Sequence, residues 1–433
     1  MSFETIPVLD LALSNDPETK PAFLTSLRNA LLDVGFLYIT NTGIPESLTQ
    51  DVMREGKAFF QLPMEKKLEI QMKNVPSFLG MYPRPTSLLT LRQRLIPSTG
   101  YNTLGSEITA QATDWREQID LSTPHPLPSA TDPLYQNLRA PNQWPDPTLL
   151  PSFRPIYEQY IQLMSTLSQR FTSLIAESLH LPAEGFSRFF DEDQQHKLKI
   201  VRYPDAAALP TTTTTTSASK STGNSKEKVL NQGVGPHKDS MLTSYLLQVP
   251  PHTGLQAQNL HGEWIDCPPQ PGTLVVAIGQ GLEALTHGVC KSTTHRVLSP
   301  EAGLGPRYSI PFFQGVSYGA TFEAVDVPAE IIALKEERDR AREGEIGGGR
   351  RDDVEFTFRK GRWGHLGEAT LSNRVKSHPD VGERWYPDIL AGIRRDQAEE
   401  RRRKEEANDV GQTTQRDGVA SGIEGGRQDV EVY

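Results

Sequence analysis

The pattern of apolar and polar positions divides the chain into a helical first part and a later part built from short strands. Residues 152–180 carry apolar side chains at three- and four-residue steps, which predicts a long helix with one buried face. Shorter helices are predicted at about 21–34 and 46–60, and Gly35 suits the position just past the end of the first. From 237 to 313, alternating or apolar segments are separated by glycine and proline, which indicates a series of strands. Such a series favours a double-sheet jelly roll, whose interior can house a metal ion.

Three side chains in the strand-rich part could hold one metal ion together. His237 and Asp239 are two residues apart, so on a β-strand they point to the same face, and His295 follows on another strand. Two imidazoles and one carboxylate on one face of an octahedral ion leave the opposite positions open, as in non-haem Fe(II) oxygenases. The His-x-Asp spacing is weak by itself, because it recurs at His378 and Asp380. The second copy has no later histidine to supply a third ligand, so we expect the metal at the first.

A second pair of polar residues follows at alternate positions of an apolar strand. Arg307 and Ser309 therefore share one face of that strand. A planar guanidinium binds a carboxylate through two parallel hydrogen bonds, and the hydroxyl adds one more donor. We expect a ligand with a carboxylate to be held beside the metal.

These motifs resemble the isopenicillin N synthase-like branch of the Fe(II)/2-oxoglutarate-dependent dioxygenases, especially its fungal members. The resemblance rests on HKD, HRV, RYS and KIVRYP, and on the phrases IPVLDL, DVGFLYITNTGIPESL, GYNTLGSE and GEATLSNRVKSHPDVGERWYP. It implies an α+β fold that is mainly β, with a jelly-roll or double-stranded β-helix core, an N-terminal helical region and a C-terminal helical extension. Along the chain we expect these parts at 1–150 (N-terminal helix-strand region), 151–320 (dioxygenase core, with a flexible insertion at 206–232), 321–392 (C-terminal extension) and 393–433 (charged tail).

The resemblance also implies cofactors and a reaction. Fe(II), 2-oxoglutarate and O2 are required, with ascorbate as a stimulant, and a small organic molecule is hydroxylated, desaturated or otherwise oxidised while succinate and CO2 are released. Secondary metabolism is the expected setting. The site residues that it implies are His237, Asp239 and His295 for the metal, and Arg307, Ser309 and Tyr203 for 2-oxoglutarate.

Three alternatives stay open at this point. Relatives with the same fold, such as isopenicillin N synthase and aminocyclopropane carboxylate oxidase, use no 2-oxoglutarate, and stimulation of O2 uptake by 2-oxoglutarate would separate them from this chain. A His-Asp-His trio could instead hold Zn²⁺ for hydrolysis, although the sequence offers no evident general base. The fold could also serve as a binding protein without catalysis, but in that case a ligand is usually lost.

Composition and charge limit the kinds of partner that we expect for this protein. The net charge of the 433 residues is −9, and no basic stripe is present, which argues against a nucleic-acid binder. No apolar run is long enough to cross a bilayer. The first residues lack a basic and apolar leader, and the two cysteines cannot form a disulfide framework, so we expect a cytoplasmic protein. The oligomeric state cannot be read from the sequence.

Overall fold

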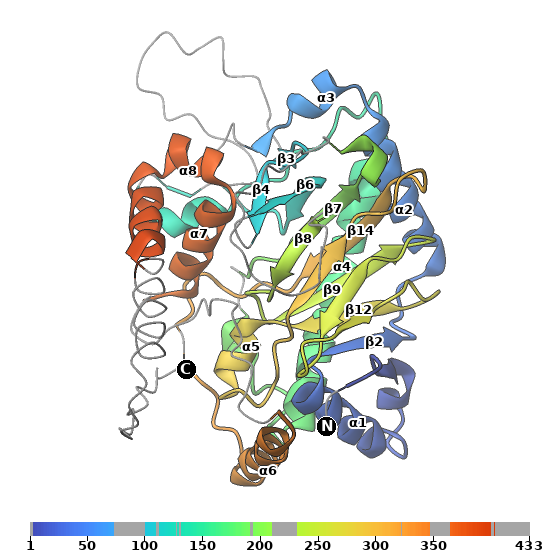
Figure 1. Cartoon of the computed structure of the whole chain (residues 1–433), viewed down its shortest axis with the longest axis vertical. Coiled ribbons are helices and arrows are strands. Elements are labelled where there is room, and N and C mark those ends of the chain that lie inside the picture. Colours follow the sequence, from blue (N-terminus) through green and yellow to red (C-terminus); the bar gives the residue numbers. More distant parts are fainter. Residues whose placement is uncertain are drawn as a thin grey trace, which may run out of the picture.

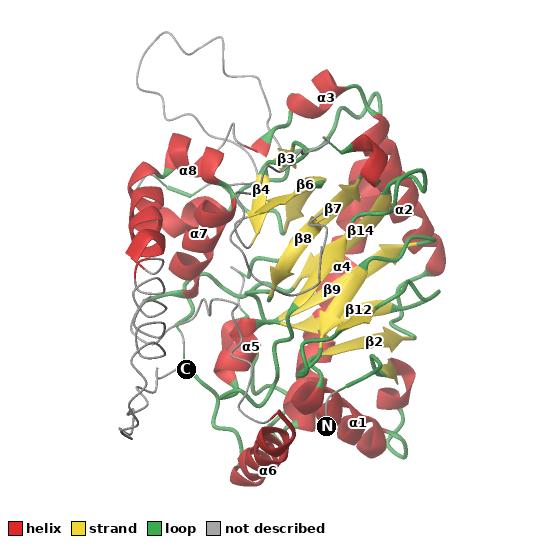
Figure 2. Ribbon diagram, viewed as in Figure 1, coloured by secondary structure: helices red, strands yellow, loops and turns green. Residues whose placement is uncertain are grey.

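Two β-sheets lie face to face and form the core of the molecule (Figures 1 and 2). The computed structural model describes residues 3–72, 100–109, 112–126, 128–129, 131–190, 194–209, 232–321, 323–346, 364–399 and 402. The large sheet contains, in spatial order, β1 (Val8–Asp10), β2 (Phe36–Thr40), β12 (Leu274–Ile278), β9 (Thr243–Val249), β14 (Arg307–Phe313), β7 (Lys197–Tyr203), β6 (Glu117–Ser122) and β3 (Gly100–Asn102). The small sheet contains β11 (Trp264–Asp266), β10 (Leu255–Gln258), β13 (His295–Leu298) and β8 (Gln232–His237). A separate hairpin is formed by β4 (Glu107–Thr109) and β5 (Ala112–Asp114).

Helices cover the outer face of the large sheet. They are α1 (Lys20–Asp33), α2 (Glu46–Gln61) and α4 (Phe153–Ser178), and α4 runs behind the strands in Figure 1. Their apolar faces share one buried cluster with alternate residues of the strands, such as Leu247 on β9 and Ile310 on β14. Gly35 ends the turn after α1 with φ of +65°, and a Cβ there would lie 2.0 Å from the Lys291 carbonyl oxygen. Glycine is needed at this position, because other residues would be strained and would clash.

The inner face of the large sheet packs against the small sheet. Residues that alternate with the outer ones, including Phe36, Leu246 and Val275, share a second apolar cluster with Val234 and Val297 of the small sheet. This sandwich of two apolar faces, about 10 Å apart, is what sheet-on-sheet packing requires. The inner surface of the sandwich is therefore where a polar site is shielded from water.

Further helices lie at the ends of the sandwich. α3 (Met64–Leu68) and α5 (Gln280–Leu285) are short, and α6 (Ala329–Ile346), α7 (Leu366–Ser377) and α8 (Pro379–Trp385) follow the last strand; residues 387–399 are also helical. Figure 1 shows α7 and α8 beside β4, at the opposite end of the sheet from β2. They share a third apolar cluster with Tyr135, Leu138 and Tyr318. Within the described residues, no helix is long and apolar enough to cross a membrane.

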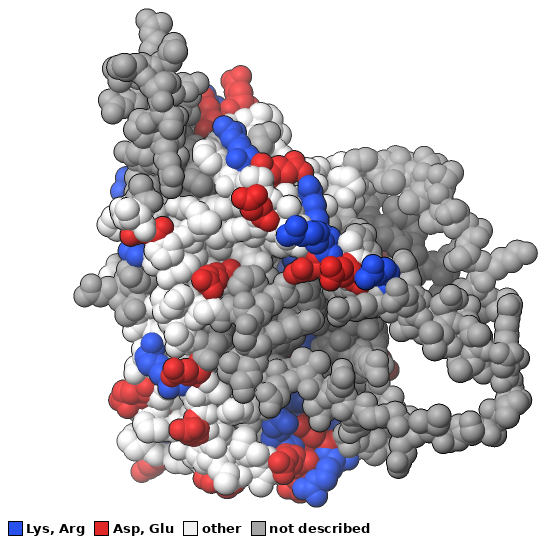
Figure 3. Space-filling view, turned by 90° about the vertical axis from the view of Figure 1, so that its left-hand side faces the viewer, with Lys and Arg blue, Asp and Glu red and all other residues white. Residues whose placement is uncertain are grey.

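Charged side chains of both signs are mixed on the surface. On the face drawn in Figure 3, Lys and Arg side chains lie beside Asp and Glu side chains, and neither sign forms a large patch of its own among the described residues. Exposed ion pairs join the two signs, such as Arg154 with Glu158 (2.9 Å) and Arg394 with Glu383 (2.7 Å). Single pairs of this kind contribute about 1 kcal/mol or less to stability, so the fold depends mainly on its buried clusters.

The predicted α+β jelly roll with helical regions at both ends is confirmed. The helices expected at 21–34, 46–60 and 152–180 correspond to α1, α2 and α4. Most of the insertion expected at 206–232 lies outside the described residues; of its ends, Ala206–Ala208 form a short 3-10 helix and Gln232 begins β8. The expected charged tail from 393 begins inside the helical stretch 387–399, and the rest of it, apart from residue 402, also lies outside the described residues.

Candidate metal and cosubstrate site

His237, Asp239 and His295 meet inside the sandwich. β8 and β13 are antiparallel neighbours in the small sheet, and their register pairs His237 directly with His295. The Asp239 Oδ1 lies 3.7 Å from His237 Nε2 and 3.8 Å from His295 Nε2. All three ligand atoms lie within 4.8 Å of one another, and among the described residues this is the only group of His, Cys, Asp or Glu side chains suited to a metal ion. The sequence thus predicted three residues that the fold does bring together.

Hydrogen bonds orient both imidazoles toward a shared centre. The Nδ1–H of His237 donates to the Gly235 carbonyl (2.8 Å), and the Nδ1–H of His295 donates to the Thr293 carbonyl (3.0 Å). Each Nε2 is then left with its lone pair free for a metal, which is the usual way in which neighbouring groups orient a ligand. Burial, together with the nearby His295, lowers the pKa of His237 to about 3. His237 is therefore neutral near pH 7, as metal binding requires.

Asp239 lies just past the end of β8 rather than on the strand, so the predicted position of Asp239 on a strand was wrong in that detail. Its backbone carbonyl accepts a hydrogen bond from the Gln280 N–H (2.7 Å) at the start of α5. The neighbouring Gly279 approaches so closely that a Cβ would lie 1.9 Å from the Met241 carbonyl oxygen. The loop that carries Asp239 is thus held by α5, and the carboxylate reaches the two histidines even though β8 has ended.

Arg307, Ser309 and Tyr203 lie together on the inner face of the large sheet. In the register of β14 with β7, Arg307 pairs with Tyr203, and Ser309 pairs with Gln248 of β9. The Arg307 side chain is fully buried, and its guanidinium lies 5.1 Å from the centre of the Tyr203 ring. One Nη2–H donates to the Gln248 Oε1 (2.9 Å). The sequence interpretation did not include Gln248, although a polar residue in the apolar strand MLTSYLLQV was a usable signal.

The hydrogen-bonding groups of Arg307 are incompletely paired. Its Nε and Nη1 have no partner among the described residues, and burial lowers its pKa. A buried guanidinium with unpaired N–H groups is costly. A carboxylate is the ligand that matches such a planar fork of donors, so these residues fit the distal end of a dicarboxylic acid.

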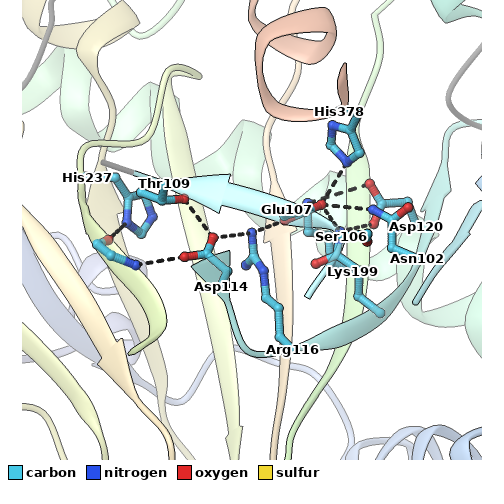
Figure 4. Close-up of polar contacts among 12 residues, drawn as sticks. Asn102, Ser106, Glu107, Thr109, Asp114, Arg116, Asp120, Lys199, His237 and His378 are labelled. Atoms are coloured by element: carbon cyan, nitrogen blue, oxygen red, sulfur yellow. Dashed lines mark hydrogen bonds and ion pairs between the residues drawn. The ribbon is translucent and has the colours of Figure 1, made fainter. Parts of the chain in front are cut away.

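A network of polar side chains extends from the metal site toward α8 (Figure 4). Asp114 on β5 accepts hydrogen bonds from the Gly235 N–H (3.1 Å) and from the Gln232 Nε2 (3.0 Å). Because Gly235 is also the acceptor for His237, Asp114 fixes the end of β8 that carries this ligand. The sequence interpretation missed Asp114, since the strand that carries it is only three residues long.

The second His-x-Asp copy belongs to the far end of this network. The His378 Nε2 lies 2.7 Å from the Glu107 carboxylate, and the Asp380 Oδ1 accepts a hydrogen bond from the Val381 N–H (2.9 Å) at the start of α8. Both side chains hold α8 in place, and no third ligand accompanies them within the described residues. Within the described residues, a third potential ligand accompanies only the first copy, and its use as a metal site stays a prediction.

Comparisons with known proteins agree with this arrangement. Residues 6–88 and 88–147 match the family described as non-haem dioxygenase in morphine synthesis N-terminal. Residues 201–316 match the 2OG-Fe(II) oxygenase superfamily. The 2-oxoglutarate-dependent dioxygenase frbJ of Dothideomycetidae sp. (strain 11243) is 60% identical over 92% of this chain and 97% of its own length. A 2-oxoglutarate-dependent dioxygenase of Gibberella zeae is 36% identical over 94% of this chain and 97% of its own length.

Solved structures share the fold. A full-length Neurospora crassa protein in complex with alpha-KG has a TM-score of 0.55 at 23% identity, over 75% of this chain and 90% of that chain. JOX2 in complex with 2OG, Fe and JA has a TM-score of 0.54 at 20% identity, over 74% of this chain and 78% of that chain. With the sequence matches above, the chain belongs to the 2OG-Fe(II) oxygenase superfamily, as an Fe(II)- and 2-oxoglutarate-dependent dioxygenase that uses O2.

Proposed function

We propose that this dioxygenase binds Fe(II) through His237, Asp239 and His295, binds the distal carboxylate of 2-oxoglutarate through Arg307 and Ser309, and oxidises a small molecule of secondary metabolism. Two imidazoles and a carboxylate whose ligand atoms lie close together are the donor set that suits a non-haem iron with open positions. The observation that carries the cosubstrate assignment is the buried Arg307 guanidinium, whose Nε and Nη1 lack partners in the described structure.

The iron and 2-oxoglutarate, when bound, supply the oxidation itself: O2 and the keto acid are consumed, succinate and CO2 are released, and the substrate is hydroxylated, desaturated or otherwise oxidised. The chain provides orientation. The hydrogen bonds of His237 and His295 to backbone carbonyls engage Nδ1 of each ring, so that Nε2 is the nitrogen that would hold the metal. Gln248 holds one edge of the Arg307 guanidinium, so that its remaining N–H groups are directed at the ligand.

Tyr203 has a supporting role in this proposal. Its ring lies against the Arg307 guanidinium, and the aromatic face stabilises the positive charge that burial disfavours. The apolar inner faces of both sheets surround the site and exclude water, which strengthens each hydrogen bond to the carboxylate.

The test is succinate formation from 2-oxoglutarate with Fe(II) and O2, measured for the wild type and for two aspartate variants. Asp239→Ala removes a proposed ligand and should abolish both basal and substrate-coupled turnover. Asp380→Ala, in the other His-x-Asp copy, is the matched control and should turn over like the wild type. Full activity with bound iron in Asp239→Ala would contradict the metal assignment, and O2 uptake without any 2-oxoglutarate would point to the oxidase relatives.

A further inference from the structure

A buried lysine on the inner face of the large sheet has no role in the proposed function. Lys197 begins β7 and is 8% exposed. Among the described residues, its Nζ donates to two neutral acceptors, the Leu138 carbonyl at 3.4 Å and the Gln195 Oε1 at 3.3 Å. Both contacts are long for a charged donor, which normally forms bonds of about 2.7–2.9 Å. Burial lowers the pKa of Lys197 well below its usual range, and the positive charge of Arg374 lowers it further.

The neighbouring carboxylates are already engaged with other bases. Asp120 pairs with Arg374 (2.9 Å) and lies 3.6 Å from Lys199, and Glu107 pairs with Arg116 and His378. No described carboxylate oxygen lies within ion-pair distance of Lys197, in contrast to Lys199 on the same face of the same strand. Within the described residues, Lys197 is thus a buried base without an ion pair of its own, although the Asp120 carboxylate acts on it from beyond ion-pair distance.

The segment that follows β14 supplies a second buried donor. The Tyr318 hydroxyl is fully buried and has no hydrogen-bond partner among the described residues. Burial raises its pKa, and the positive charges of Arg374 and Arg139 oppose that rise. The segments that carry the two donors are paired, because Gln194 bridges to Ser317 and the Gln195 N–H donates to the Val316 carbonyl (3.3 Å). The positive charge of Arg374 acts on both groups.

This region lies on the same face of the sheet as the metal site and in the same row of residues across the strands. Cross-strand pairs in the register form one row that consists of Phe36, Ala277, Ser244, Phe313 and Lys197. Paired residues of neighbouring strands point to the same side of a sheet. At one end of the row, the Phe36 ring lies 5.4 Å from the His295 ring. At the middle, the buried Ser244 Oγ has no partner among the described residues either.

We propose that Lys197, together with the Tyr318 hydroxyl, binds a carboxylate of the substrate that is oxidised, so that the substrate is an organic acid. This rests on the proposed function, because the row matters only if the metal lies at its His295 end. A carboxylate beside Lys197 favours its protonated form, and the resulting ammonium and one hydroxyl match the two oxygens of the carboxylate. Four strand spacings of about 4.8 Å separate Phe36 from Lys197, so the carboxylate and the carbon to be oxidised lie toward opposite ends of an extended molecule.

The first test uses propionate as the probe and thermal unfolding as the readout. The full-length protein is loaded anaerobically with Fe(II) and saturating 2-oxoglutarate, so that Arg307 is already occupied. Propionate at constant ionic strength should raise the unfolding temperature in proportion to the logarithm of its concentration, whereas propionamide should not. Lys197→Met should weaken propionate binding about tenfold or more, since a charge-assisted hydrogen bond is lost, and Tyr318→Phe should weaken it less. Lys66→Met, at a surface lysine paired with Glu69, is the matched control.

The outcomes separate the two proposals. The rise in unfolding temperature that 2-oxoglutarate itself causes is measured first. If 2-oxoglutarate causes no rise, the proposed function fails. If 2-oxoglutarate binds but propionate has no effect on the wild type, or an equal effect on Lys197→Met, the carboxylate site is refuted.

A second test measures how far a panel of organic acids and their amides stimulates succinate release. Acids should stimulate the wild type at least tenfold more than their amides, and this preference should vanish in Lys197→Met. A neutral substrate that is indifferent to Lys197→Met would overturn the inference.

Discussion

Replacement of Arg307 by methionine should separate binding of the cosubstrate from stability of the fold. The guanidinium is 1% exposed, and its Nε and Nη1 are unpaired in the described structure. If they bind the distal carboxylate, Arg307→Met removes two charge-assisted hydrogen bonds, worth about 1.5–3 kcal/mol each. The loss of about 3–6 kcal/mol corresponds to weaker binding by a factor of about 10² to 10⁴.

Two assays measure this effect. Anaerobic calorimetry of the Fe(II)-loaded protein gives the affinity for 2-oxoglutarate directly. Thermal unfolding is an independent assay of the same binding. Ligand at a hundred times its dissociation constant stabilises the wild type by about 2.7 kcal/mol, and the variant should lose nearly all of this stabilisation. Without ligand, the variant should unfold close to the wild-type temperature, because the removed charge was poorly paired.

Arg202→Met is the matched control. Arg202 lies on the neighbouring strand β7, but its guanidinium pairs with Glu117 (2.6 Å). Its replacement should leave the affinity for 2-oxoglutarate within about twofold, since it removes no contact of the site. Unchanged affinity in Arg307→Met, or an equal loss in Arg202→Met, would refute the assignment of the cosubstrate to Arg307.

Two further predictions follow from neighbouring contacts. Gln248→Leu removes the acceptor that orients Arg307 and should raise the KM for 2-oxoglutarate about tenfold with kcat little changed; an unchanged KM would show that Gln248 does not position the guanidinium. For His196, burial lowers the pKa to about 4, below its unfolded value of 6.5, so its neutral form is favoured in the fold. Stability is therefore unaffected above pH 6.5 and falls by up to about 3 kcal/mol as the pH drops from 6.5 to 4, because only the unfolded chain takes up the proton. Denaturant titrations should show a shallower pH dependence for His196→Gln, whereas the exposed control His261→Gln should keep the wild-type slope.

Long periodic segments made much of the fold predictable. The sequence predicted α4 from its stripe of apolar residues and β14 from its alternation. Burial of one face gives a helix a repeat of three to four residues and a strand a repeat of two. The strands β3 to β6 could not be predicted in the same way. They lie in a stretch rich in proline, serine and threonine. β3, β4 and β5 have three residues each, and β6 buries polar residues, so their sequences show little alternation.

The site was predicted residue by residue, but its supports were not. His237, Asp239 and His295 could be chosen because only the first His-x-Asp copy is followed by a further histidine, whereas Gln248 and Asp114 act only through contacts between distant strands. Lys197 and Lys199 in KLKIVRYP would ordinarily face water. The structure buries Lys197 and leaves Lys199 partly buried. Lys199 meets Asp120 and Glu107 from other strands, and no local pattern reveals such partners.

The most direct test of the account is an anaerobic titration of the Fe(II)-loaded protein with 2-oxoglutarate, followed by visible spectroscopy. Chelation of Fe(II) by the keto acid should produce a metal-to-ligand charge-transfer band in the wild type. The band should appear only at much higher 2-oxoglutarate concentrations in Arg307→Met, and it should be absent in Asp239→Ala. Iron that binds without any band in the wild type, or an undiminished band in Asp239→Ala, would contradict the claim that these residues form the iron and 2-oxoglutarate site.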